Sequence, residues 1–150
     1  TREKIFGLEE DKYDHTPQSK YQVLMRKGAK VLYNHVATNH KDFVKEVISH
    51  VPEGKNYKAL PKGGGDSRKF HTAWTRYHGQ KPSPTIDTGH RNHFHYELNR
   101  VPTVRENARL QSFPDVFRFL GNRTQQNRQV GNAVPPMLGY HIAKKLMEYI

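Results

Sequence analysis

Arg100-Val-Pro-Thr-Val-Arg-Glu-Asn-Ala-Arg-Leu-Gln-Ser-Phe-Pro-Asp-Val-Phe117 is the stretch of this 150-residue sequence that carries the clearest structural signals. Thr103 and Glu106 have the spacing of a capping box, in which the first residue caps a helix and the glutamate reaches back to the cap. Apolar residues follow, and Pro114 ends the run because proline cannot continue a helix. The sequence therefore predicts a short helix that starts after Thr103 and stops at Pro114.

A second stretch, Gln129-Val-Gly-Asn-Ala-Val-Pro-Pro-Met-Leu138, leads into the end of the sequence. Its two prolines favour the opening of a last helix, since proline is well tolerated in the first turn. Within that helix, Leu138, Ile142, Leu146 and Tyr149 recur on one side as an apolar stripe. Such a stripe has to pack against another surface.

The sequence upstream predicts less regular structure. Residues 1–30 are interpreted as a connector with at most short structure, in which Tyr21–Met25 is a brief strand or a helical turn. Phe43, Val44, Val47 and Ile48 predict a short helix capped by Thr38 or Asn39. From residue 53 to residue 95, glycine and proline are frequent, so we expect short strands joined by long loops.

Composition and charge exclude several classes of protein and favour others. Lysine and arginine total 25 against 14 acidic residues, a formal net charge of +11, which favours an anionic partner such as nucleic acid. The sequence lacks the roughly 18 consecutive apolar residues that a membrane span needs. It also lacks a signal-peptide pattern and an initiator methionine, and the latter suggests a piece of something longer. Zero cysteines exclude a disulfide, a cysteine zinc site and a thiolate nucleophile in this chain.

Two segments contain side chains suited to chemistry or binding. His90, His93 and His95 could share a metal ion, although solvated or phosphate-facing histidines are the simpler interpretation. In the other segment, basic residues alternate with aromatic ones between residues 62 and 81. Such a pattern suits contacts to guanine and stacking on bases, and it equally suits a half-buried hairpin with its charges in water.

The two quoted stretches resemble the last two conserved blocks of the DNA cytosine-5 methyltransferases. Both strings, Arg-Glu-x-Ala-Arg-Leu-Gln-x-Phe-Pro-Asp and Gln-x-Gly-Asn-Ala-Val-Pro-Pro, occur in the expected order. Lys81-Pro-Ser-Pro-Thr-Ile-Asp-Thr88 is similar to the end of that family's target-recognition domain. The resemblance covers residues 31–150. The family's Phe-x-Gly-x-Gly, Pro-Cys, Glu-Asn-Val and Gln-x-Arg-x-Arg blocks are missing from the sequence.

The resemblance implies an α+β fold, in which a small irregular β-rich target-recognition domain precedes C-terminal helices that complete a Rossmann-like, S-adenosylmethionine-dependent methyltransferase domain. It divides the chain into a connector from a missing catalytic domain (1–30), a target-recognition domain (31–99) and a return to the catalytic domain (100–150). The chain would be the C-terminal portion or subunit of such an enzyme, from a bacterial restriction-modification system. Without the catalytic cysteine it would be inactive alone.

The resemblance also assigns roles to residues, with no catalytic and no metal-binding residue in this chain. Thr85 would contact the phosphate beside a flipped cytosine. Arg76 and Arg68 are candidate guanine contacts, and Lys69, Trp74 and Tyr77 are further candidate DNA contacts. Asn132 and Ala133 would line the S-adenosylmethionine pocket. The structural residues of the motifs would be Arg105, Glu106, Arg109, Gln111, Gln129 and Gly131, the last through backbone freedom.

The implied partners are double-stranded DNA and the catalytic half or subunit, in the bacterial cytoplasm at the nucleoid, with no membrane. S-adenosylmethionine would bind only with that half present. Two alternatives stay open at this point. One is a free-standing, non-catalytic DNA-binding module, whose final helix would be covered within the chain. The other is a nuclease with a histidine-bound metal, which would depend on His93.

Overall fold

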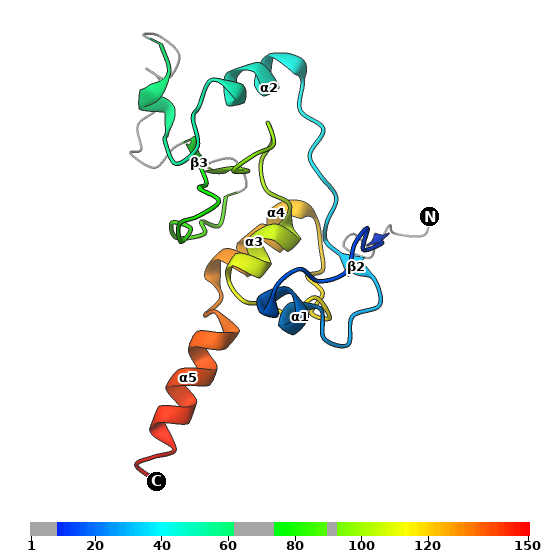
Figure 1. The fold of residues 1–150 in the computed structure, drawn as a ribbon, viewed down its shortest axis with the longest axis vertical. Coiled ribbons are helices and arrows are strands. Elements are labelled where there is room, and N and C mark those ends of the chain that lie inside the picture. The colour runs from blue at the N-terminus through cyan, green and yellow to red at the C-terminus, as the bar shows by residue number, and fades with distance from the viewer. Residues whose placement is uncertain (1–8, 62–73, 90–92) are drawn as a thin grey trace.

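A computed structural model describes residues 9–61, 74–89 and 93–150 of the chain (Figure 1). These residues form a helical body, a smaller irregular lobe and a C-terminal helix that projects from the body. The elements of the body are β1 (Glu10–Asp11), α1 (Lys20–Arg26), β2 (Leu32–Tyr33), α3 (Val104–Leu110) and α4 (Arg123–Asn132). Strands β1 and β2 pair antiparallel, with Glu10 opposite Tyr33.

The lobe lies beyond the body on the side away from the C-terminus (Figure 1). Its elements are α2 (Asp42–Ser49), the 3-10 helix η1 (Tyr57–Ala59), β3 (Thr75–Arg76) and β4 (His93–Phe94). Strands β3 and β4 pair parallel, with Thr75 opposite His93. The described part of residues 31–99 thus holds strands of two residues each. The lobe is irregular and the fold is mixed α and β, but the expected richness in β-structure is not found in this part.

Two apolar cores hold these parts together. The body core contains Val104 and Ala108 of α3, Val130 of α4, and Phe113 and Phe119 of the loop between them. Tyr77 and Ile86, from the segment after β3, complete the same core. The lobe has a separate core of Ile48, Val51, Phe94 and Val101. The segment after β3 therefore belongs to the body by packing.

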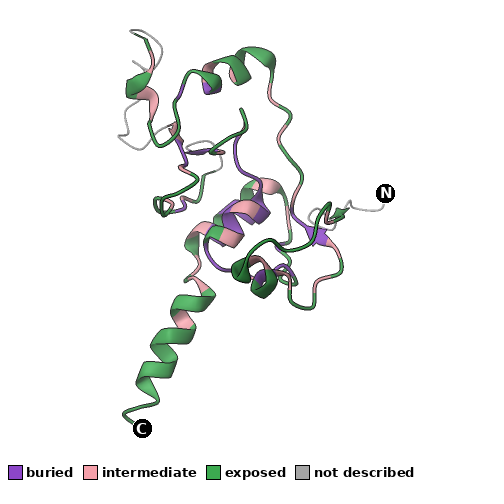
Figure 2. Cartoon of the chain, viewed as in Figure 1, coloured by how far each residue is buried: buried purple, intermediate pink, exposed green. Residues whose placement is uncertain are grey.

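Helix α5 (Pro136–Leu146) differs from the other described α-helices because none of its residues is buried (Figure 2). Pro136 occupies its first turn, as the sequence predicts. The Met137 N–H donates to Ser112 Oγ at 3.0 Å, which fixes the start of the helix to the end of α3. Leu138, Ile142 and Leu146 are each more than half exposed. None of the described helices is long and apolar enough to cross a membrane.

Other expectations about helices are met or corrected by the structure. Helix α3 has the complete Thr103–Glu106 capping box, but it ends at Leu110, before the expected stop at Pro114. Helix α2 is present, but its N-cap is Lys41 and neither Thr38 nor Asn39 caps it. Helix α1 occurs inside the segment interpreted as a connector, and helix α4 was not predicted.

Candidate functional site

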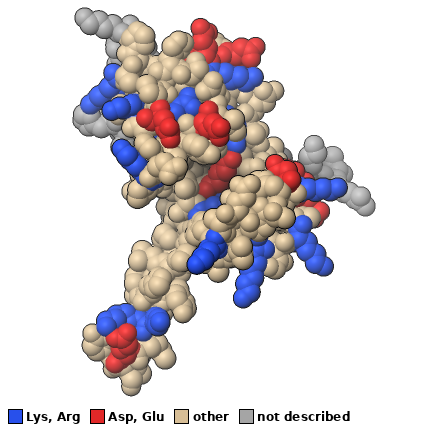
Figure 3. Space-filling view, viewed as in Figure 1, with Lys and Arg blue, Asp and Glu red and all other residues tan. Residues whose placement is uncertain are grey.

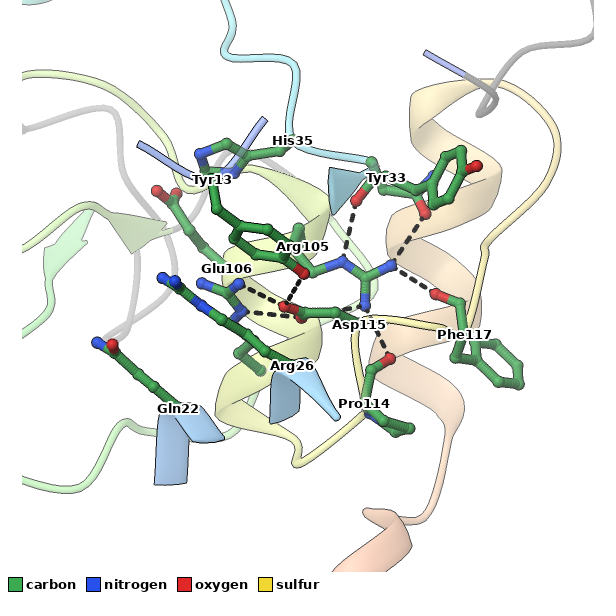
Figure 4. A network of polar contacts seen from close by, with 12 residues as sticks. Tyr13, Gln22, Arg26, Tyr33, His35, Arg105, Glu106, Pro114, Asp115 and Phe117 are labelled. Carbon is green, nitrogen blue, oxygen red and sulfur yellow. Dashed lines mark hydrogen bonds and ion pairs between the residues drawn. The ribbon is translucent and has the colours of Figure 1, made fainter. Parts of the chain in front are cut away.

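Arg105 lies at the centre of the body with no exposed surface, and its guanidinium joins three segments (Figure 4). Nε donates to the carbonyl of Tyr33 at 2.9 Å. Nη1 donates to the carbonyl of Pro114 at 3.2 Å, and Nη2 donates to that of Phe117. The main-chain N–H of Arg105 donates to Asn34 O at 2.9 Å. Arg105 therefore pins β2 and the loop after α3 to helix α3.

Asp115 balances this buried positive charge and is itself fully buried. Arg109 binds its carboxylate with two hydrogen bonds of 2.9 and 2.6 Å, and Arg105 Nη1 lies 3.9 Å from it. Tyr13 donates its hydroxyl to the same carboxylate at 2.7 Å. Burial acts to raise the pKa of Asp115, but the hydrogen bonds from Arg109 and Tyr13 outweigh it, so the pKa lies below its ordinary value. Burial and the bond to Asp115 raise the pKa of Tyr13 to about 12.

Glu106 makes the second ion pair of this region. Both of its oxygens accept from Arg100 at 2.7 Å, and one also accepts the Thr103 N–H at 2.8 Å. Burial raises the pKa of Glu106 less than these bonds lower it, so the net shift is downward. Arg105, Glu106 and Arg109 are thus all held in ion pairs within the chain, and their geometry is that of structural residues.

Arg76 is also buried, with 5% of its surface exposed, and it is the centre of the lobe. Its guanidinium makes hydrogen bonds to the carbonyls of Val51, Ile48, His95 and Leu98, and to the side chain of Asn99. Five bonds use all five N–H groups of the guanidinium. Arg76 therefore has no donor left for a base, and this corrects the expectation that it contacts guanine.

Tyr77 is buried as well, which removes it from the candidate DNA contacts. Its ring stacks on His93, with ring centres 5.1 Å apart, and its hydroxyl donates to Asn107 Oδ1 at 3.2 Å. Asn107 in turn lies 3.5 Å from Asn127 of α4. A line of polar contacts thus connects the segment after β3 with α3 and α4.

The other candidate DNA contacts differ in their placement. Thr85 is exposed, next to the buried Ile86. Trp74 is partly buried against the lobe core and has a positive φ of 56°, which is unusual for a bulky residue. Arg68 and Lys69 lie outside the described residues.

Gly131 of α4 lies directly against the segment that carries Thr85. A Cβ atom at Gly131 would be 2.7 Å from the carbonyl oxygen of Asp87 and 2.8 Å from Thr88 N. Its φ is not positive, so close approach of the two backbones, and not the conformational freedom expected from the sequence, explains the glycine.

The remaining motif residues lie within two positions of Gly131 in the sequence or, for Gln111, bond to its neighbour Val130. Gln111 is buried and donates to the carbonyl of Val130 at 2.6 Å, and Gln129 donates to that of Leu120 at 2.8 Å. Asn132 is exposed at the last residue of α4, so its amide is accessible to a ligand. The Ala133 N–H donates to Val130 O and its methyl group packs on the body core. Asn132 therefore fits recognition of a polar group, and Ala133 can supply only an apolar wall.

The histidine metal site finds no support among the described residues, which contain no group of three metal-ligating side chains. His93 is buried against Tyr77. His95 accepts main-chain N–H groups of Glu97 and Leu98 at Nδ1, so that nitrogen is already used. His90 lies outside the described part of the chain.

Sequence reasoning missed Asn34, Tyr13 and Asp115. The Asn34 side chain pairs with both the N–H and the carbonyl of Phe119, at 3.0 and 2.8 Å. Its φ of 63° is a conformation that asparagine tolerates, so residue type alone offered a weak signal. Tyr13 and Asp115 are 102 residues apart, and nothing local to either predicts their bond.

The sequence of this chain matches proteins of a known family. A family model for the C-5 cytosine-specific DNA methylase matches residues 3–148. The chain belongs to the C-5 cytosine-specific DNA methylase family. Type II methyltransferase M1.HphI of Haemophilus parahaemolyticus is 44% identical over 122 residues, which are 79% of this chain and 32% of that protein. Type II methyltransferase M.DdeI of Desulfomicrobium norvegicum is 35% identical over 162 residues, or 95% of this chain and 39% of that protein.

A solved structure gives the same fold for this DNA methylase segment. It is that of a candidate DNA modification methyltransferase encoded within an E. coli prophage, with a TM-score of 0.69 at 22% identity. The match covers 93% of this chain and 40% of the solved one. The chain thus spans well under half the length of the DNA methylases it matches.

Proposed function

We propose that this chain is the C-terminal portion of a bacterial DNA (cytosine-5-)-methyltransferase of the restriction-modification kind. In this role it binds duplex DNA and forms one wall of the S-adenosylmethionine pocket. The reaction needs a cysteine thiolate that attacks carbon 6 of cytosine, and the sequence contains no cysteine. The nucleophile therefore comes from the part of the enzyme that corresponds to the rest of M1.HphI, of which this chain spans 32%.

The uncovered apolar face of α5 is the observation that carries the proposal. Leu138, Ile142 and Leu146 are between 51 and 58% exposed, on a helix of 11 residues with no buried position. A helix of this length is marginal in water unless it packs against another surface. A catalytic half that covers this face accounts for both the exposure and the position of α5, directly after Asn132 and Ala133.

DNA binding is supported by charge and by the position of Thr85. Basic side chains are spread over the face seen in Figure 3, and the formal net charge is +11. Thr85 is exposed, so its hydroxyl is free to approach a phosphate beside a flipped cytosine. Arg68, Lys69 and Trp74 stay candidates for base or phosphate contacts. Arg76 and Tyr77 support them from within the fold.

The cofactor role falls on Asn132. Its exposed amide offers a donor and an acceptor for the amino-acid part of S-adenosylmethionine, and Ala133 would line the pocket beside it. The bound cofactor supplies the methyl group. We further propose that residues 31–99 form the recognition domain, that residues 100–150 return to a Rossmann-like catalytic domain, and that residues 1–30 connect the two. The enzyme would act on the bacterial nucleoid in the cytoplasm.

Methyl transfer tests the proposal directly. The chain alone and the chain mixed with a cysteine-bearing catalytic half are incubated with duplex DNA and tritium-labelled S-adenosylmethionine. We expect weak DNA binding and no labelled DNA with either half alone, and sequence-specific labelling with the mixture. Labelled DNA from this chain alone, or none from a mixture in which the halves co-elute, contradicts the proposal.

The same experiment separates the free-standing module from the proposed enzyme. A free-standing module needs no partner and would have its last helix covered within the chain, whereas α5 has no buried residue. Tight, sequence-specific DNA binding by the chain alone, unchanged by the catalytic half, would favour the module.

A further inference from the structure

We infer that Gly131 is a positioning residue. It allows the segment that carries Thr85 to lie directly against helix α4, and it thereby determines the position of the target strand relative to the methyl donor. At Gly131 the backbone of α4 lies directly against the backbone of residues 87 and 88. Given the proposed roles of Thr85 and Asn132, on which this inference rests, one contact links the two binding functions. Thr85 lies two residues before Asp87, and Asn132 follows Gly131 directly.

The side chain of Ile86 also holds this segment to the body. Ile86 is 7% exposed and packs in the body core with Val104, Ala108 and Val130. The hollow between this segment, His93 and Asn107 has a volume of about 10 Å³, which is the space of one water molecule. The packing of Ile86 and the contact at Gly131 together fix the position of the segment on the body. Any atom added at Gly131 must therefore displace something.

Helix α4 will hold its position better than the segment. Val130 has no exposed surface, and Gln111 donates to its carbonyl at 2.6 Å, so this turn of α4 is fixed to the end of α3. Residues 84–88 lie in no helix or strand. An alanine at position 131 would push residues 87 and 88 outward, and it would move Thr85 while Asn132 stays in place.

This asymmetry predicts a specific kinetic signature in the enzyme assembled from this chain and the cysteine-bearing half. For Gly131→Ala, the KM for DNA should rise about tenfold, as expected for loss of one charge-assisted hydrogen bond. The KM for S-adenosylmethionine should stay within about twofold of the wild-type value, because the helix that carries Asn132 does not move. General destabilisation of the fold would not separate the two constants in this way.

The measurement is steady-state methyl transfer with each substrate varied in turn. Thr124→Ala is the matched control, since Thr124 is exposed on the same helix and should leave both constants unchanged. Ile86→Val removes one methylene from the side chain that packs this segment in the body core, and it should raise the KM for DNA in the same direction by a smaller factor. Ile86→Val also tests the inference if Gly131→Ala does not fold.

Results that overturn the inference are well defined. A KM for DNA that is unchanged in Gly131→Ala, or in Ile86→Val where the former does not fold, overturns it. An equal rise of both constants also overturns it. If the wild-type assembly transfers no methyl group, the proposed function itself is wrong, and the inference fails with it.

Discussion

Arg105 binds carbonyl groups of three separate residues with a planar, forked cation, and an ammonium group cannot reproduce this geometry. The cost of burying its charge is offset by Asp115, which Arg109 and Tyr13 hold in place. At this scale the stability of the body depends on satisfying every donor and acceptor around the pair, because an unpaired buried charge is far more costly than the pair is favourable.

We therefore expect Arg105→Ala to lower the free energy of unfolding by about 3–5 kcal/mol, since it leaves the three carbonyls without a donor and weakens the charge balance of Asp115. Urea denaturation followed by circular dichroism measures the change. Arg128→Ala, an exposed arginine of α4, is the control and should stay within about 0.5 kcal/mol. A loss of similar size in both variants would contradict the assigned role of Arg105.

Three histidines around the start of α3 predict a dependence of stability on pH. His40 accepts the Val101 N–H, His95 accepts two main-chain N–H groups, and His35 lies 3.0 Å from the Thr103 hydroxyl. Burial lowers the pKa of each of these histidines below its ordinary value. As the pH falls below about 6.5, the unfolded chain takes up protons before the folded chain does. The contribution of these three histidines to the free energy of unfolding is complete above that pH, and it is lost as the pH falls through their lowered pKa values.

The free energy of unfolding should thus be smaller at pH 5.5 than at pH 7.5. Urea titrations across this range measure it. His40→Gln keeps an acceptor near the Val101 N–H without a titrating ring, so the dependence on pH should become weaker. His141→Gln, on the exposed α5, should leave it unchanged. A pH profile that His40→Gln does not alter would speak against this explanation.

Residue-level prediction from the sequence failed where distant parts of the chain bury a polar side chain. An arginine in a basic, aromatic stretch suggests a surface contact, yet Arg76 is buried by carbonyls 19 to 28 residues away in the chain. No local pattern encodes such partners. Thr85 and Asn132, to which the resemblance assigns binding roles, are exposed, and those roles stay predictions.

Helix α4 illustrates the same limit at the level of an element. Its sequence, Arg-Thr-Gln-Gln-Asn-Arg-Gln-Val-Gly-Asn, contains one large apolar residue, so no hydrophobic period marks it as a helix. Its start does carry a signal, since Asn122 and Gln125 form a complete capping box like that of Thr103 and Glu106. Capping residues would have found this helix where periodicity could not.

Asn122→Ala should lower the free energy of unfolding by about 1 kcal/mol, because the first turn of α4 loses its side-chain acceptor. The Asn122 side chain accepts the Gln125 N–H at 3.0 Å, and the Gln125 side chain accepts the Asn122 N–H at 2.8 Å. Thermal and urea denaturation measure the effect, with Thr124→Ala as a control on the same helix. Equal stability of Asn122→Ala and wild type would show that the capping box does not hold the helix.

Over the whole molecule, the division between a packed body and a bare α5 (Figure 2) predicts two different responses to substitution. Ile142→Ser should change the stability of the chain alone by less than about 0.5 kcal/mol, since Ile142 is 51% exposed. The same substitution should weaken assembly with the catalytic half about tenfold or more, because a buried isoleucine contributes about 1.5–3 kcal/mol.

Fluorescence anisotropy of the labelled chain, titrated with the catalytic half, measures this affinity. Lys144→Ser changes a residue on the opposite side of α5 and should leave the affinity unaltered. Equal weakening by both substitutions would mean that the apolar stripe is not the contact surface.

The bonds of Arg76 have a consequence for how the sequence of this lobe can vary. Four of the five acceptors around it are main-chain oxygens, which every amino acid possesses. At an exposed position such as Leu98 the side chain can therefore be exchanged while the frame of the lobe is retained, whereas Ile48 and Val51 also pack in the lobe core. If the lobe reads DNA as proposed, substitutions at its exposed positions would change the base sequence that is read without a change of the backbone.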